Sequence, residues 1–77
     1  MDLDHARAEY EAGRLVEVVI EPSGEGNGWM VVVHASDGGS SKITDHSGVE
    51  KVFHSIEHAT DVARDIGFST IRVEERF

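Results

Sequence analysis

The sequence predicts an α+β domain in which helices cover one face of a curved antiparallel sheet. Two runs rich in β-branched residues, 15–21 and 29–35, are joined by a glycine-rich loop, as in a hairpin. An amphipathic helical pattern follows near 56–66, and a shorter strand-like segment comes after it. Helices on one face of the sheet are the simplest layered arrangement that buries both apolar surfaces.

A short helix is predicted at the N-terminus, over residues 2–12. Leu3, Ala6 and Tyr10 recur there at helical spacing. Gly13 follows, at a position where glycine commonly ends a helix. The apolar stripe is narrow, so the sequence allows this helix either to pack against the sheet or to fray.

The first strand is predicted over 15–21. Val16, Val18 and Ile20 occupy alternate positions, so they are expected to share one face of the strand. Pro22 ends the strand because proline cannot donate a hydrogen bond to a sheet.

The second predicted strand, 29–35, is apolar on both faces apart from His34. We therefore expect it in the middle of the sheet. The sequence at 37–40 is typical of a tight hairpin turn. A short third strand is predicted over 41–44, and 49–53 is the candidate for a fourth.

The helix over 56–66 has the clearest signal. Its apolar residues form one stripe at the helical period, namely Ile56, Ala59, Val62, Ala63 and Ile66. Ser55 is the expected N-cap, Gly67 the expected stop, and Phe68 is expected to fold back onto the last turn. A last strand is predicted over 69–76. The complete prediction is a meander of three to four strands plus a C-terminal strand, in the order α-β-β-β-(β)-α-β.

The chain is expected to form a single domain, residues 1–77, in the cytoplasm of a bacterium. With 39% hydrophobic and 29% charged residues it is globular rather than disordered. A chain this short buries only about 60–65% of its unfolded surface, which leaves little volume for a pocket. It has no cysteine, and its N-terminus lacks the features of a signal peptide. The longest apolar run, 29–33, is too short to span a membrane.

The net charge is −8, from 7 basic and 15 acidic residues spread along the chain. Such a surface repels phosphate backbones. The element order resembles that of the double-stranded RNA-binding domain, which docks lysines at the start of its second helix on phosphates. The matching positions here are Ser55, Glu57, His58 and Asp61. Nucleic acid is therefore not an expected partner, and weak association with it is kept only as an alternative.

The stretch His54-Ser55-Ile56-Glu57-His58 matches the H-x-x-E-H spelling of a class of zinc peptidases. That chemistry needs both histidines on one face of a continuous helix. With Ser55 as N-cap, His54 precedes the helix and the two imidazoles diverge. We therefore expect no metal site. If one existed, His54 and His58 would be its candidate ligands.

No catalytic residue and no cofactor is predicted. The glycine-rich loop at 24–28 leads into a strand and is followed by no lysine, whereas phosphate-binding loops open a helix. Asp61 and Asp65 lie one helical turn apart, where they are expected to form a solvated face. His34 and the serines after it lack the strand–turn–helix context of a nucleophile.

Four short pieces of the sequence resemble small uncharacterised bacterial α+β proteins. They are Gly28-Trp29, the turn at 45–48, the segment 53–59 with its F-x-S-I-x-x-A spelling, and Ile66-Gly67. The resemblance covers about fifty residues, from Gly28 onward. It implies a cytoplasmic bacterial domain and implies no activity.

The leading hypothesis is a non-enzymatic protein-interaction or regulatory accessory module. The expected contact surface is a sheet face or edge, which would bind an unidentified protein or a second copy of the chain. Trp29 and His34 are the candidate interaction residues. The alternatives are a small-ligand or metal-binding protein that uses His54 and His58, and the weak nucleic-acid association named above.

Overall fold

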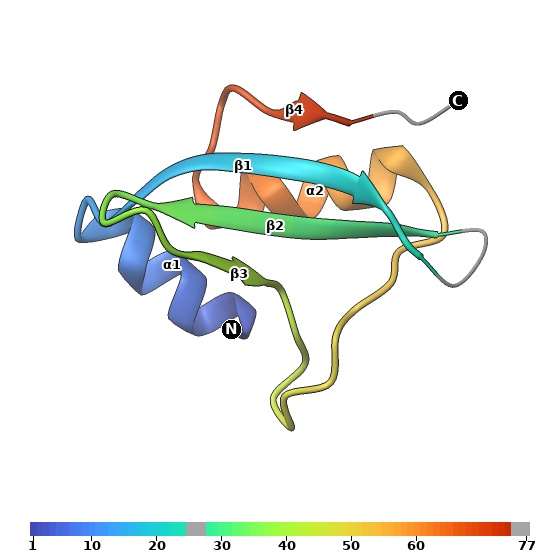
Figure 1. Ribbon diagram of the computed structural model, residues 1–77, viewed down its shortest axis with the longest axis horizontal. Helices are drawn as coiled ribbons and strands as arrows, with labels where there is room; N and C mark the ends of the chain where they lie inside the picture. The colour runs from blue at the N-terminus through green and yellow to red at the C-terminus, as the bar shows by residue number, and fades with distance from the viewer. Residues whose placement is uncertain (25–27, 75–77) are drawn as a thin grey trace.

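A mixed sheet forms one layer of the molecule and helices form the other (Figure 1). The computed structural model describes residues 1–24 and 28–74. Within these ranges the elements, in chain order, are α1 (Leu3–Glu11), β1 (Leu15–Pro22), β2 (Trp29–Ala35), β3 (Ser40–Lys42), α2 (Ile56–Ile66) and β4 (Arg72–Val73). The predicted α+β class and the order α-β-β-β-α-β are confirmed.

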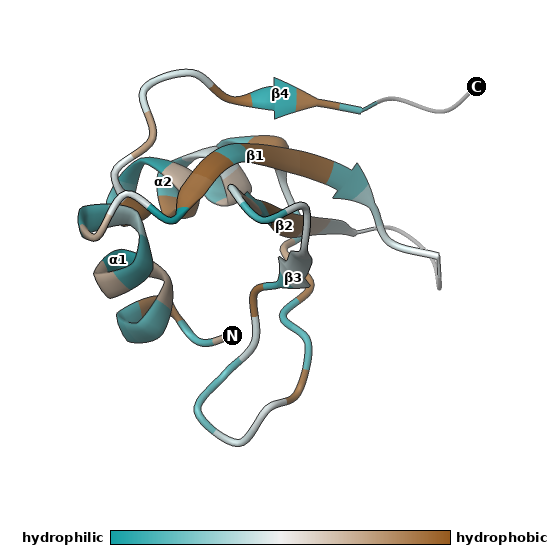
Figure 2. Cartoon of the chain, turned by 60° about the vertical axis from the view of Figure 1, so that its left-hand side comes forward, coloured by the Kyte–Doolittle hydropathy of each residue, from teal (hydrophilic) through white to brown (hydrophobic). Residues whose placement is uncertain are grey.

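The strands lie in the order β3-β2-β1-β4. The first three form the predicted antiparallel meander, in which Ile20 pairs with Val31. The chain then passes through α2 and returns on the other side of β1, where β4 runs parallel to it and Val73 lies beside Ile20. Both central strands are apolar along much of their length (Figure 2).

The hydrophobic core lies between the sheet and the helices. The helices contribute Ala6, Ala59, Val62, Ala63 and Ile66, and the sheet contributes Leu15, Val18, Ile20, Val31 and Val33. The predicted apolar stripe of α2 is thus buried, apart from its first member, Ile56, which is half-buried. No helix among the described residues is long and apolar enough to cross a membrane.

The prediction that Val16 lies on the same face of the strand as Val18 and Ile20 is wrong. The register between β1 and β2 shifts between Leu15 and Glu17, so the strand carries a bulge there. The bulge turns Leu15 into the core and leaves Val16 62% exposed. The predicted alternation holds again from Val18 onward, where Val18 and Ile20 are fully buried.

The segment 49–53 does not form a fourth strand. It makes two isolated bridges, one between Thr44 and Glu50 and one between Trp29 and Phe53. Of its apolar residues only Phe53 is buried, so the segment has no continuous face to press against the core. The third strand is also shorter than predicted, since β3 ends at Lys42.

The last strand is shorter than predicted within the described residues, because β4 covers only Arg72–Val73. Residues 75–76 of the predicted strand lie outside the described ranges.

The N-terminal helix packs rather than frays. Ala6 of α1 is completely buried, and the Tyr10 ring meets the Phe68 ring edge-on at a centroid distance of 4.7 Å. Phe68 occupies this position because the chain folds back after α2, with the Phe68 N–H donating to the carbonyl of Ala63. The predicted ending of α2 thus supplies the surface on which α1 rests.

Candidate functional site

The histidine pair of the zinc-peptidase spelling is split by a helix cap. The Ser55 hydroxyl accepts a hydrogen bond from the backbone N–H of His58 at 3.1 Å, as an N-cap does. His54 therefore lies before α2, on an exposed bend, while the His58 ring packs edge-on against Phe53 at 5.0 Å. Within residues 1–24 and 28–74, no group of three or more histidine, aspartate or glutamate side chains is placed to hold a metal ion.

The two candidate interaction residues, Trp29 and His34, do not share a surface. Trp29 begins β2, is half-buried, and packs against the core beside Phe53. His34 lies near the other end of β2 and, by the alternation of side chains, on the opposite face of the sheet. His34 is half-buried and pairs in register with Glu17 and Ser40.

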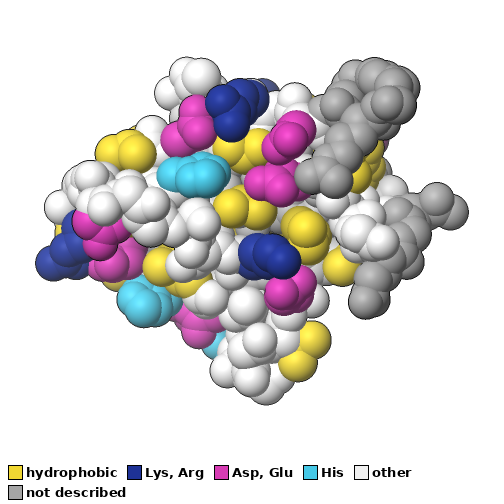
Figure 3. All heavy atoms as spheres, viewed as in Figure 1, with side chains coloured by type: hydrophobic (Ala, Val, Ile, Leu, Met, Phe, Trp, Pro, Cys, Tyr) yellow, Lys and Arg dark blue, Asp and Glu magenta, His cyan; other side chains and the backbone are white. Residues whose placement is uncertain are grey.

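The face of the sheet turned away from the helices has mixed charge (Figure 3). One row across it runs from Lys42 through Val32 and Val19 to Arg72, as the strand registers show. Val19 and Val32 are nevertheless only 1% and 6% exposed. The two valines of this row therefore expose little apolar surface. This face shows charged groups of both signs interspersed with small apolar areas (Figure 3).

The outer edge of β3 is occupied by the first residue of the chain. The terminal amine of Met1 donates to the carbonyl of Lys42 at 3.2 Å, and the Thr44 N–H donates to the carbonyl of Met1 at 2.8 Å. These bonds use backbone groups that a further strand would need. The end of this edge nearest Thr44 is therefore closed to strand addition.

The outer edge of β4 is open within the described part of the chain. The Glu74 N–H donates to the carbonyl of Ile20, and the parallel register also directs the backbone of Arg72 toward β1. Backbone groups alternate in direction along a strand, so the N–H and C=O of Val73 point away from the sheet. No described strand pairs with that side of β4 (Figure 1).

The side chains of this edge also alternate. Val73 packs against the core on the helix side, so Arg72 and Glu74 lie on the opposite face. The Arg72 guanidinium is 3.7 Å from the Glu17 carboxylate, and the two side chains are 62% and 43% exposed. An exposed pair of this kind adds little to stability, which leaves Arg72 able to make a second contact.

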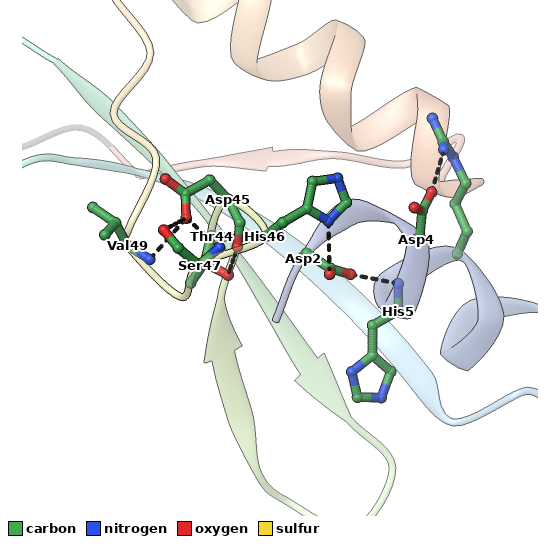
Figure 4. Close-up of polar contacts among 9 residues, drawn as sticks. Asp2, Asp4, His5, Thr44, Asp45, His46, Ser47 and Val49 are labelled. Carbon is green, nitrogen blue, oxygen red and sulfur yellow. Dashed lines mark hydrogen bonds and ion pairs between the residues drawn. The ribbon is translucent and has the colours of Figure 1, made fainter.

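A small hollow of about 190 Å³, lined mostly by charged and polar residues, lies between the start of α1 and the turn after β3, the region drawn in Figure 4. Asp2 joins its two sides, because one carboxylate oxygen caps α1 at the His5 N–H and the other lies 3.2 Å from His46 Nδ1. The His5 bond, and after it the His46 contact, hold the pKa of Asp2 below its ordinary value of 3.8. The first contact caps α1 and the second joins α1 to the turn after β3, so they account for Asp2 structurally.

The turn on the other side of this hollow is built around Asp45. One Asp45 carboxylate oxygen accepts from the Ser47 hydroxyl at 2.7 Å and from the backbone N–H groups of Ser47 and Val49 (Figure 4). The Ser47 hydroxyl, followed by the Val49 N–H, holds the pKa of Asp45 below 3.8. This carboxylate is likewise committed to holding the turn.

A second, shallow hollow of about 470 Å³ lies where the segment before α2 passes the start of β2. Val49 and Val52 are exposed beside it, at 62% and 47%, and the half-buried Met30 also lines it. Lys42 and Glu50 border it and form an exposed ion pair at 3.4 Å. This hollow offers a few apolar contacts and has charged residues at its border. Its lining residues include no catalytic groups that point toward one another.

The acidic pair on α2 faces solvent, as the sequence predicts. Asp61 and Asp65 are both exposed. Arg7 of α1 reaches the end of α2, where it lies 3.5 Å from the Asp65 carboxylate and donates to the Asp65 carbonyl. This carboxylate therefore has a structural contact between the helices.

Comparison with protein-family models, with curated proteins and with solved structures finds no match to this chain. Of the sequence-based candidates, Trp29 and His58 both contact Phe53, which directly precedes His54 in the chain, whereas His34 lies near the other end of β2. The feature that sequence reasoning missed is the outer edge of β4, with Arg72, Val73 and Glu74. Its sequence signal is an arginine and a glutamate two positions apart on the last predicted strand.

Proposed function

We propose that this domain is a protein-interaction module of the bacterial cytoplasm that catalyses no reaction, and that its partner adds a strand along the outer edge of β4. The supporting observation is the asymmetry of the two sheet edges. Met1 occupies the end of the β3 edge nearest Thr44, whereas the outward N–H and C=O of Val73 have no strand beside them in the described chain.

Strand addition suits a domain of this size. The affinity comes from main-chain hydrogen bonds, and specificity comes from alternate side chains, so no deep pocket is needed. On β4 the alternate side chains that would meet a partner are Arg72 and Glu74 on one face and Val73 on the other. An added strand would therefore meet one charge of each sign beside an apolar contact.

The proposal is tested with a proline on each edge. Val73→Pro removes the outward N–H of β4 and leaves the bonds to β1 in place, since those use Arg72 and Glu74. The matched control is Ser40→Pro at the start of β3, where the N–H also points away from the neighbouring strand and proline is tolerated. Circular dichroism and thermal melts establish that both variants fold.

The readout is in-cell crosslinking of the tagged domain in its native host, quantified by mass spectrometry. We expect wild type and Ser40→Pro to crosslink to the same set of proteins, which can include second copies of the domain. Val73→Pro should lose these crosslinks. Equal crosslinking by all three proteins, or none by wild type, would overturn the proposal.

A further inference from the structure

We infer that the strand added to β4 comes from a second copy of this chain, which runs antiparallel to the first about a two-fold axis at Val73. This inference rests on the proposed function, because it names the occupant of the same edge. Its basis is that the backbone of Val73 and the charges of Arg72 and Glu74 are both self-complementary about this axis, among the residues that the structure describes.

The backbone requirement is met at Val73. In an antiparallel pair, the residue on the two-fold axis lies opposite itself and, if its N–H and C=O point outward, exchanges two hydrogen bonds with its copy. The N–H and C=O of Val73 point outward because the N–H of Glu74, one position on, points inward to Ile20. The Val73 N–H of each copy therefore donates to the Val73 carbonyl of the other.

The charge requirement is met by the flanking residues. A residue one position before the axis lies opposite the residue one position after the axis in the other copy. Arg72 of each copy therefore lies opposite Glu74 of the other copy. These are non-hydrogen-bonded pairs, in which side chains approach most closely. Both fall on the face of the sheet turned away from the helices. Opposite charges in cross-strand pairs stabilise the pairing, and like charges oppose it.

The alternative register is not complementary. Ile71 is the other described residue of this segment whose backbone points outward, by the same alternation. A two-fold axis at Ile71 would place Arg72 opposite Thr70 of the second copy, with no charge to pair it. Of these two axes within the described residues, the alternation of charges thus favours Val73.

The resulting dimer has one continuous sheet through both copies. A two-fold axis perpendicular to the sheet keeps the helices of both copies on the same face, so each core stays covered as it is in one copy. The contact is small and the net charge of −8 on each copy opposes association. We therefore expect a reversible dimer that forms as the protein concentration rises from about 10 µM to about 1 mM. Such weak association is typical of interfaces that bury less than the standard area.

The test uses charge reversal in both directions. Arg72→Glu leaves acidic residues at both flanking positions, and Glu74→Arg leaves basic residues at both. Each variant then has two like-charge pairs in its homodimer and should lose about tenfold or more in association. An equimolar mixture of the two variants restores two opposite pairs, so it should form a heterodimer, and the double variant Arg72→Glu/Glu74→Arg should form a homodimer again.

The measurement is sedimentation equilibrium at about 150 mM salt, where the long-range repulsion between copies is screened beyond about 8 Å. Lys51→Glu and Glu11→Arg are the matched controls, because both positions are exposed and lie outside β4. They should associate as wild type does. Circular dichroism checks the fold of every variant.

The outcomes are distinct. Restoration of association in the mixture, after its loss in each single variant, supports the two-fold axis at Val73. A wild type that stays monomeric at the highest concentration overturns the inference that the partner is a second copy, while edge-dependent crosslinking to another protein would still support the proposed function. A dimer that persists unchanged in both single variants also overturns it, since β4 would not form the contact.

Discussion

The ring of Tyr10 lies so close to Gly67 that a β-carbon added to Gly67 would stand 2.5 Å from two of the ring carbons. Gly67 also has a φ of +135°, a conformation that side chains disfavour. Two elements far apart in the sequence, α1 and the end of α2, therefore meet at a position where no side chain fits.

We expect Gly67→Ala to lower the free energy of unfolding by roughly 2–4 kcal/mol, through backbone strain and overpacking together. Gly13→Ala separates the two causes, because Gly13 has a φ of +77° and nothing within 4 Å of an added β-carbon. The control should cost only about 1–2 kcal/mol. Urea unfolding measures both, and equal losses would show that the Tyr10 contact contributes nothing.

Ser55→Ala should cost about 1 kcal/mol, because it removes the hydroxyl that caps α2 at the His58 N–H. His54→Ala should cost less than about 0.5 kcal/mol, since His54 is exposed and precedes the helix. Thermal melts with and without zinc give both values. A larger effect at His54 together with zinc-dependent stability would favour the metal-binding alternative.

The Asp45 carboxylate should titrate below 3.8, as followed by NMR. Because its pKa is lower folded than unfolded, it stabilises the fold above the unfolded pKa, and this contribution is lost as the pH falls through the folded value. Ser47→Ala removes the largest cause of the shift and should raise the pKa of Asp45 toward 3.8. A titration unchanged by Ser47→Ala would mean that the turn is not organised by this hydroxyl.

The bulge in β1 predicts different costs for two apolar residues of the same strand. Val16→Thr should change stability by less than about 0.5 kcal/mol, because Val16 is largely in solvent. Ile20→Ala should cost about 2–5 kcal/mol, because Ile20 is completely buried. Urea unfolding of the two variants compares them. A comparable loss of stability in Val16→Thr would mean that Val16 is buried on the same face as Ile20, as the sequence predicts, and would contradict the bulge.

Local signals predicted α2 well. Its start, apolar stripe and end lie within about fifteen consecutive residues, and Ser55 and Gly67 act through bonds that need no distant partner. The central strands were predicted for a similar reason, since their runs of β-branched residues are also a local signal. The bulge at Val16 escaped prediction because it depends on the register with β2, which a single strand does not specify.

The candidate site was predicted less well than the fold. The sequence singled out Trp29 and His34 by residue type, and the sheet places them on opposite faces. The backbone groups of Val73 carry no signal in the sequence, because every residue except proline has the same N–H and C=O. Only the pairing of β4 with β1 decides which of them point outward.

By itself, the sequence determined the α+β class, the helix at 56–66 with both of its ends, and the central strands, because these depend on periodicity and capping among neighbouring residues. The tertiary structure decided the parallel placement of β4, the covering of the β3 edge by Met1 and the contact between Tyr10 and Gly67. Each of these joins segments far apart in the chain, so its geometry follows from how the layers pack and from no local pattern.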